Sequence, residues 1–117
     1  MVTRRRGSYV PDRGDLIWLS FDPQAGHEQA GRRPGLVLSP ILYNRRSGLA
    51  LVCPVTSQIK GYPFEVTLPQ GLSLSGVVLA DHVRSLDWRA RRAQFAEQCS
   101  PDLVHEVAAR ITPLLGS

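Results

Sequence analysis

The sequence predicts a mainly β protein, a small closed or partly closed β-barrel with a C-terminal α-helix. Short apolar runs alternate with turn-forming residues along most of the chain, a spacing typical of small all-β folds. Near the C-terminus the apolar residues change to a helical period. A length of 117 residues fits one domain with its own core, so we expect a single domain over residues 1–117.

The expected strands are short and differ in their apolar pattern. Residues 15–21 are apolar on both faces, whereas Phe64, Val66 and Leu68 alternate on one face. Pro54 cannot donate a hydrogen bond to a β-ladder, so its strand is expected at a sheet edge or over a bulge. The strands are predicted at residues 15–21, 35–39, 49–56, 64–68, 76–80 and 83–86.

The two ends of the chain carry different signals. Residues 1–13 lack an apolar period and contain Gly and Pro, so they indicate a flexible N-terminal tail. Ser100 and Pro101 suit the N-cap and the first position of a helix. One apolar stripe follows at helical spacing, and Pro113 is expected to loosen the helix near Thr112. The stripe consists of Leu103, Val107, Ile111 and Leu114.

Positive charge is concentrated in the first half of the chain. Lys plus Arg number 14 against 10 Asp plus Glu, a net charge of +4, and Lys60 is the only lysine. Residues 1–60 hold nine cations and four anions, whereas residues 61–117 hold five and six. Arginine binds phosphate through paired hydrogen bonds, so this pattern points to a polyanionic partner. A solvated basic surface accounts for the composition equally well.

Other features narrow the setting in which the protein works. The longest apolar run, around residues 49–55, is far shorter than the roughly 18 residues of a membrane helix. Arg4, Arg5 and Arg6 precede no apolar stretch, so they open no secretory signal. The two cysteines form no disulfide framework and suit a reducing compartment. We therefore expect a cytoplasmic protein that does not enter a membrane.

The long connection over residues 22–34 is the first candidate site. Connections of this length in a compact domain are uncommon and are usually functional or unstructured. His27 and Glu28 could transfer protons, and Arg32 or Arg33 could hold a phosphate. The alternative is a solvated loop whose Gly and Pro residues only form turns, and the residues alone slightly favour it.

A second candidate loop spans residues 56–63. It offers hydroxyls, an amide, Lys60 and the ring of Tyr62, which suit single-stranded nucleic acid with its unstacked bases. The alternative is that the aromatic residue belongs to the core. The His and Cys residues are scattered without the close pairs of a zinc site, so we expect no metal and no cofactor.

Taken together, the motifs of this chain resemble those of the MazF/PemK toxins. The resemblance covers roughly residues 9–115 in the family's order, and Lys60–Val66 and Trp88–Arg91 are closer to the MazF branch than to the PemK/Kid branch. The motifs are Gly14–Trp18, Phe21–Pro23, Gly26–Gly31, Arg33–Pro34, Pro54–Thr56, Lys60–Val66, Gly76–Asp81 and Arg84–Arg91.

This resemblance implies an SH3-like β-barrel with a C-terminal helix, usually a homodimer. It implies a metal-independent endoribonuclease that cuts single-stranded RNA, mainly mRNA, at short motifs. The products would be a 2′,3′-cyclic phosphate and a 5′-hydroxyl. It also implies a cognate MazE-like antitoxin whose acidic C-terminal segment blocks the RNA groove.

By the same resemblance, the chemistry belongs to four residues. Arg33 matches the family's essential arginine and Thr56 its catalytic threonine, and both are expected to stabilise the phosphorane. Glu28 is the preferred general base, with His27 as the alternative base or acid. The expected RNA-contacting residues are Arg32, Gln29, Ser57, Gln58, Lys60, Tyr62 and Asp81.

One position departs from the PemK/Kid pattern. That branch has an Arg-any-Asp motif on a later strand, and here the position reads Leu79-Ala80-Asp81, without the arginine. A structural role for Asp81 is therefore as well supported as a catalytic one.

Two rival functions fit a similar barrel. A CcdB-like toxin would bind DNA gyrase and cut no RNA, and a general RNA-binding barrel would bind RNA without cleaving it. The loop over residues 26–34 together with Thr56 favours the ribonuclease, and Arg33 is the arginine whose loss should matter most.

Overall fold

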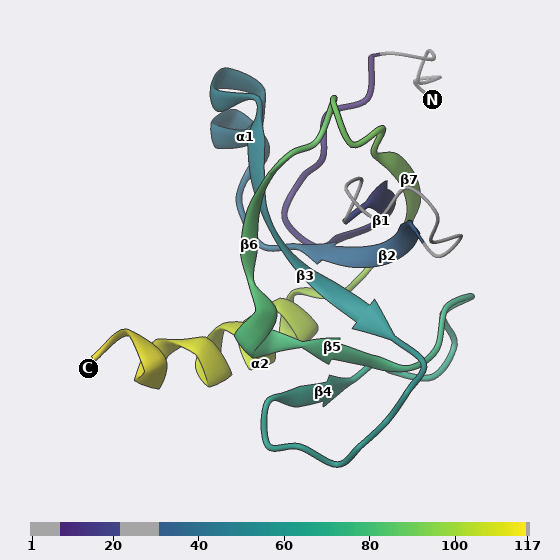
Figure 1. The fold of residues 1–117 in the computed structure, drawn as a ribbon, viewed down its shortest axis with the longest axis vertical. Coiled ribbons are helices and arrows are strands. Elements are labelled where there is room, and N and C mark those ends of the chain that lie inside the picture. Colours follow the sequence, from purple (N-terminus) through teal and green to yellow (C-terminus); the bar gives the residue numbers. More distant parts are fainter. Residues whose placement is uncertain (1–7, 22–30, 117) are drawn as a thin grey trace.

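The computed structural model describes residues 8–21 and 31–116, and its strands form a strongly curled sheet (Figure 1). The strands are β1 (Asp15–Ser20), β2 (Arg32–Val37), β3 (Leu49–Thr56), β4 (Glu65–Thr67), β5 (Val77–Leu79), β6 (Arg84–Asp87) and β7 (Gln94–Gln98). The helices are α1 (Ile41–Ser47) and α2 (Pro101–Ile111), with short 3-10 turns η1 (Ala80–His82) and η2 (Thr112–Leu115).

The strands form one antiparallel sheet in the order β4-β5-β3-β2-β1-β7, with β6 pairing to β3 off this path. The mainly β class with a C-terminal helix is confirmed. Within the part of the chain that the structure describes, no ladder joins β4 to β7, so the sheet curls like a barrel without closing.

Strand β3 lies in the middle of the sheet, so of the two positions expected for Pro54, a sheet edge or a bulge, the edge is wrong. On one side β3 pairs with β2 throughout Val52–Pro54. On the other side Leu49–Val52 pair with β6, whereas Val55 and Thr56 pair with β5. Pro54 thus lies where β3 changes partners, the place in a central strand where a missing N–H donor disrupts the ladder least.

Two elements were not predicted, the short helix α1 and the strand β7. Helix α1 has seven residues and no side-chain cap. The sequence of β7, Gln-Phe-Ala-Glu-Gln, has little alternation of apolar and polar residues, and the strand is held by pairing with β1. Strand β2 also begins earlier than expected, at Arg32 in place of Gly35. Helix α1 and strand β7 depend on tertiary contacts that the local sequence pattern does not reveal.

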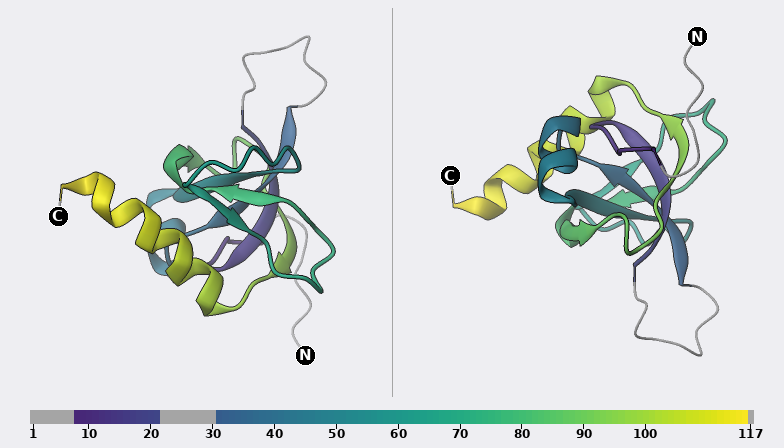
Figure 2. Two further views of the ribbon diagram at one scale, coloured as in Figure 1. Left: turned by 90° about the horizontal axis from the view of Figure 1, so that it is seen from below. Right: turned by 90° about the horizontal axis from the view of Figure 1, so that it is seen from above.

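The predicted C-terminal helix is present, and it covers one side of the sheet (Figure 2). Ser100 occupies the N-cap position, although its side chain makes no capping hydrogen bond. Helix α2 ends at Ile111, and the 3-10 turn η2 that follows contains Pro113, so the expected loosening is confirmed. In the described residues no helix is long and apolar enough to span a membrane.

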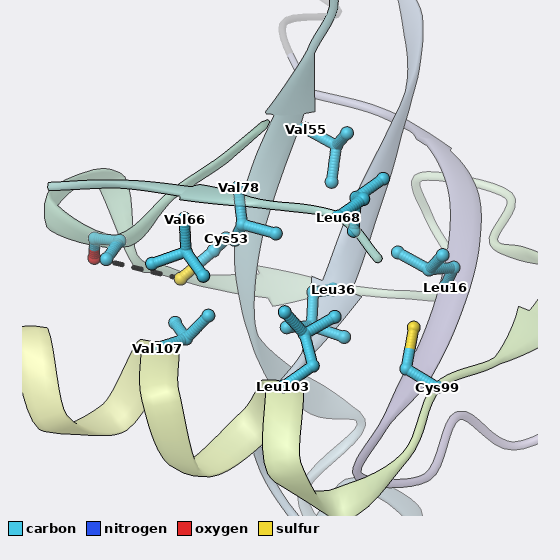
Figure 3. Close-up of a cluster of buried hydrophobic side chains, with 11 residues drawn as sticks. Leu16, Leu36, Cys53, Val55, Val66, Leu68, Val78, Cys99, Leu103 and Val107 are labelled. Atoms are coloured by element: carbon cyan, nitrogen blue, oxygen red, sulfur yellow. Dashed lines mark hydrogen bonds between the residues drawn. The ribbon is translucent and has the colours of Figure 1, made fainter. Parts of the chain in front are cut away.

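The core consists of two apolar clusters on either side of the curled sheet. Strand β1 serves both, since Leu16 belongs to the first cluster and Ile17 and Leu19 to the second. This explains why both faces of the predicted strand are apolar. The first cluster packs β2, β3, β4 and β5 against α2 (Figure 3). Its members are Leu16, Leu36, Cys53, Val55, Val66, Leu68, Val78, Ala80, Cys99, Leu103 and Val107.

The N-terminal tail was predicted to extend to residue 13, but its last residues are ordered. Residues 1–7 lie outside the described part of the chain, but the following residues pack against the barrel. Pro11 is fully buried, and its carbonyl accepts a hydrogen bond of 2.7 Å from Asn44 Nδ2. The Tyr9 hydroxyl donates to Asp15 Oδ2 at 2.6 Å. Long-range contacts therefore order a segment that has no local signal of its own.

Asn44 connects this segment to helix α1. Its side chain is fully buried; Oδ1 accepts from Ser39 Oγ at 2.6 Å, and Nδ2 donates to the Pro11 and Ser39 carbonyls.

Replacing Asn44 by Ala leaves these buried groups without partners, so we expect Asn44→Ala to lower the free energy of unfolding by about 2–4 kcal/mol. Urea unfolding measures the loss. Arg45→Ala, an exposed change on the same helix, should stay within about 0.5 kcal/mol of the wild type, and equal losses would contradict the role of the network.

Candidate functional site

A cleft of about 490 Å³ opens where the start of β2, the end of β3 and the middle of β1 meet the loop between β4 and β5. It combines a guanidinium, several hydroxyls, an amide and an indole, the groups that bind phosphates and bases. The lining residues are Trp18, Arg33, Pro34, Val55, Thr56, Ser57, Gln58, Ser73, Leu74 and Ser75.

Four predicted site residues meet in this cleft although they come from two strands. Arg33 is on β2, Thr56 ends β3, and Ser57 and Gln58 follow it. The register of the sheet brings them together, because β2 pairs directly with β3. The cleft therefore contains residues from both segments that the sequence marked separately, Arg33 and Pro34 from the first and Thr56, Ser57 and Gln58 from the second.

Arg32 lies outside the cleft. Its guanidinium donates to the carbonyl of Arg92 at 2.7 Å, to the carbonyl of Trp18 at 3.2 Å and to Gln94 Oε1 at 3.1 Å. These bonds connect β2 to the start of β7. Since neighbouring residues of a strand point to opposite faces, Arg32 and Arg33 have different surroundings. The residues alone left open which arginine could hold a phosphate, whereas the family resemblance singled out Arg33, and Arg33 is the one that lines the cleft.

Thr56 is held by close packing against β5. It pairs with Val77, and Gly76 approaches so closely that a Cβ there would stand 2.2 Å from the Thr56 carbonyl oxygen. The Thr56 hydroxyl oxygen accepts a hydrogen bond from the Gln58 N–H at 3.1 Å. A hydroxyl that accepts a bond keeps its own proton for donation, so Thr56 is able to donate to a phosphate oxygen.

Lys60 and Tyr62 are on the same loop as Ser57 but do not line the cleft. The loop is organised by Glu65, whose carboxylate accepts the N–H groups of Lys60 and, at 2.8 Å, of Gly61. The Tyr62 side chain is 60% exposed, and Lys60 Nζ lies 5.9 Å from its ring centre. Tyr62 is therefore no part of the core, so the core alternative for this residue is wrong.

Asp81 is in the turn η1 and is also absent from the cleft lining. Its carboxylate lies 3.8 Å from His82 Nε2. It also influences Cys53: burial chiefly, and the charge of Asp81 second, raise the pKa of that thiol to about 12. Asp81 thus contacts His82 and influences Cys53 from outside the cleft.

Three predicted residues, His27, Glu28 and Gln29, lie outside the described residues, as does most of the loop that contains them. Within residues 8–21 and 31–116, no group of three or more His, Cys, Asp or Glu side chains is placed to hold a metal ion.

Sequence reasoning missed Trp18, the segment Ser73–Ser75 and Glu97. Trp18, on β1, is 36% exposed and lines the cleft. Glu97, on β7, contacts two of the lining residues: its Oε2 accepts the Ser73 N–H at 2.8 Å, the Ser73 hydroxyl at 2.6 Å and the Leu74 N–H at 3.1 Å. Trp18 is a large aromatic residue within a predicted strand, and this was the available signal that its ring could take part in binding. Glu97 gave none, because its partners are 24 residues away in sequence.

The hydrogen bonds from Ser73 are the main cause that lowers the pKa of Glu97 below its ordinary value of 4.5. A lowered pKa means that the ionised group stabilises the fold above about pH 4.5, and that this contribution is lost as pH falls through the lowered value. The difference in unfolding free energy between wild type and Glu97→Gln should therefore be constant near neutral pH and shrink in acid. Urea unfolding at several pH values checks this, and a difference that grows in acid would contradict it.

Comparison with known proteins places this geometry in a family. The family model for the PemK-like, MazF-like toxin of type II toxin-antitoxin system matches residues 12–115. The endoribonuclease toxin MazF of Escherichia coli (strain K12) is 52% identical over 116 residues, covering 99% of this chain and 100% of that protein. The endoribonuclease PemK of Escherichia coli is 37% identical over 108 residues, covering 89% and 81%.

A solved structure agrees with these sequences. MazF from Deinococcus radiodurans has a TM-score of 0.85 and 62% identity to this chain, covering 93% of this chain and 99% of that one. A crystal structure of MazE-MazF from the same organism matches with a TM-score of 0.82 and 56% identity, covering 92% and 97%. The resemblance drawn from the motifs is confirmed. The chain belongs to the family of PemK-like, MazF-like toxins of type II toxin-antitoxin systems.

Proposed function

We propose that this chain is an endoribonuclease toxin that cuts single-stranded RNA, mainly mRNA, in the cleft between Arg33 and Thr56. The observation that carries the proposal is that these two residues, from different strands, line one cleft together with Trp18. The MazF and PemK relatives are both endoribonucleases. The chain would cut at short motifs and leave a 2′,3′-cyclic phosphate and a 5′-hydroxyl.

The reaction makes three demands on the cleft. The 2′-hydroxyl must lose its proton, the anionic phosphorane must be stabilised, and the leaving 5′-oxygen must gain a proton. Arginine side chains stay protonated near neutral pH, so Arg33 serves as a donor to the phosphate oxygens and not as a base. The Thr56 hydroxyl donates a hydrogen bond to the same oxygens.

The proton transfers are assigned to the loop before β2. Glu28 is the preferred base and His27 the alternative base or acid, since both types of side chain can exchange protons near neutral pH when suitably placed. A pH–rate profile distinguishes them. Glu28→Gln should remove the acidic limb if Glu28 is the base, whereas His27→Gln should remove it if His27 is the base.

The RNA would run along the cleft and the adjoining loop. Ser57 and Gln58 offer donors and acceptors to phosphates or base edges, and the exposed face of Trp18 offers a surface on which a base can stack. Lys60 and Tyr62 would meet the strand further along the same loop. Neutralising phosphates releases counterions, so binding should weaken steeply as salt rises.

The regulatory partner would be a MazE-like antitoxin with an acidic C-terminal segment. The structure of MazE-MazF from Deinococcus radiodurans supports such a partner. The same basic cleft that accepts RNA would accept the acidic segment, so the two ligands would compete. We further propose that the toxin acts in the cytoplasm as a homodimer.

One experiment separates this function from that of a CcdB-like gyrase toxin. Purified protein is incubated with single-stranded RNA in one tube, and with gyrase and supercoiled plasmid in another, both with excess EDTA in a parallel set. We expect new RNA ends with and without EDTA and no effect on gyrase. Gyrase inhibition without RNA cleavage would replace the proposal by its rival, and abolition of cleavage by EDTA would overturn metal independence. The Arg33–Thr56 cleft favours the ribonuclease.

A further inference from the structure

We infer that Glu97 is a positioning residue for the cleft, holding the segment Ser73–Ser75 in place as the wall against which RNA binds. The inference rests on the proposed function, because it assigns this wall to RNA. Glu97 itself does not line the cleft and touches no reacting group.

The contact is concentrated on one carboxylate oxygen. Oε2 accepts two bonds from Ser73, through its N–H and its hydroxyl, and a third from the Leu74 N–H. Charged acceptors form hydrogen bonds roughly twice as strong as neutral ones. Three such bonds hold the two successive peptide N–H groups of Ser73 and Leu74 together with the Ser73 side chain.

The wall has little support from regular structure. It belongs to the connection between β4 and β5, whose base is closed by a hydrogen bond of 3.0 Å from the Leu68 N–H to the Gly76 carbonyl. Between these two residues the chain forms turns and bends, with Ser73 and Ser75 exposed and Leu74 packed against the first core cluster. Glu97 therefore supplies the polar attachment on the side of the loop that faces β7.

The carboxylate is presented by a rigid part of the sheet. Glu97 pairs with Leu16, which is fully buried in β1. The β1–β7 ladder shifts register between Leu16 and Ile17, so that Glu97 and Phe95 oppose neighbouring residues and Ala96 is the extra one. Bulges of this kind redirect the side chains next to them, and here the redirected side chain meets the loop.

This arrangement predicts a separation of kinetic effects. Arg33 and Thr56 are held by β2 and β3, so they keep their places when the wall loosens. Loss of Glu97 should therefore raise KM for single-stranded RNA by roughly tenfold and change kcat by less than about threefold, the signature of lost binding that is equally strong in the ground state and the transition state. A purely electrostatic role predicts the opposite sign, because removing a negative charge near an RNA site would lower KM.

The test uses steady-state cleavage of a single-stranded RNA oligonucleotide containing a mapped cut site. Glu97→Ala should raise KM most, Glu97→Gln less because its amide oxygen still accepts, and Ser73→Ala less because both backbone N–H donors remain. The double variant with Glu97→Ala and Ser73→Ala should have the KM of Glu97→Ala alone, since loss of Glu97 already removes the hydrogen bond from the Ser73 hydroxyl. Glu106→Ala, which removes an exposed carboxylate on α2 paired with Arg110, is the matched control and should leave KM unchanged.

Hydrogen exchange makes the result independent of catalysis. In Glu97→Ala the amides of Ser73 and Leu74 should exchange faster than in the wild type, whether or not the chain cleaves RNA. Faster exchange with raised KM supports the inference, and unchanged exchange or a lowered KM in both Glu97 variants overturns it. If the wild type itself leaves RNA intact while exchange responds as expected, the proposed function fails and the attachment of the wall stands. If Glu97→Ala does not fold, Glu97→Gln and Ser73→Ala decide the question.

Discussion

Arg33→Ala is expected to lower kcat for cleavage of single-stranded RNA by about 100- to 1000-fold, the usual loss when one donor to a developing oxyanion is removed. Among the described residues, Arg33 is the arginine that lines the cleft, and Thr56 lines it too. Arg33→Lys should retain part of the activity, because lysine keeps the charge but cannot form the paired hydrogen bonds of a guanidinium. Steady-state cleavage of an oligonucleotide measures both variants.

The control for this prediction is an arginine elsewhere on the surface. Arg45, on α1, is exposed and lies outside the cleft, so Arg45→Ala should cleave like the wild type apart from a small electrostatic change. Circular dichroism confirms that each variant is folded. Wild-type kcat in a folded Arg33→Ala protein would contradict the proposed mechanism.

Gly76→Ala is the change expected to damage both fold and activity. Gly76 has φ +124, a conformation that residues with a Cβ rarely adopt, and the added carbon would lie 2.2 Å from the Thr56 carbonyl oxygen. Backbone strain and forced separation of β3 from β5 together should lower the free energy of unfolding by about 3 kcal/mol or more. Cleavage should fall too, because the atoms that must move belong to Thr56 and Ser57.

A second glycine separates the steric clash from the backbone strain. Gly71 has φ +98, but a Cβ there would meet nothing within 4 Å. Gly71→Ala should therefore lower the free energy of unfolding by only about 1–2 kcal/mol and leave cleavage nearly unchanged. Urea unfolding and RNA cleavage of the two variants are compared directly. Equal losses from both substitutions would show that the approach of Gly76 to Thr56 does not matter.

The parts of the fold that could be predicted are those with a strong local pattern. The apolar run of β1, the long strand β3 and the helical stripe of α2 all appear where the sequence indicates. Helix α1 and strand β7 do not follow from local pattern. The first is fixed by the buried Asn44 side chain, and the second by pairing with β1. Pro54 led to the wrong prediction of an edge strand, because a proline can also lie where a central strand changes its pairing partner, as β3 does.

The candidate site shows the same division. Arg33 and Thr56 were predicted by motif, and the register between β2 and β3 brings them into one cleft. The hydrogen bonds of Arg32 could not be predicted, because they depend on the acceptors that Trp18 and the segment around the start of β7 offer to its guanidinium. Glu97 could not be predicted either. Its effect on the cleft passes through a contact between distant segments, and neither segment has a motif.

The central claim is that this cleft cleaves RNA by attack of the 2′-hydroxyl without a metal ion. The most direct measurement is end-group analysis of two RNA oligonucleotides digested in excess EDTA, identical except for a single 2′-deoxy nucleotide at the cut position. The account predicts 2′,3′-cyclic phosphate and 5′-hydroxyl ends from the all-ribose strand and no cut at the deoxy position. Cleavage at the deoxy position, or 3′-hydroxyl ends from the all-ribose strand, would contradict it.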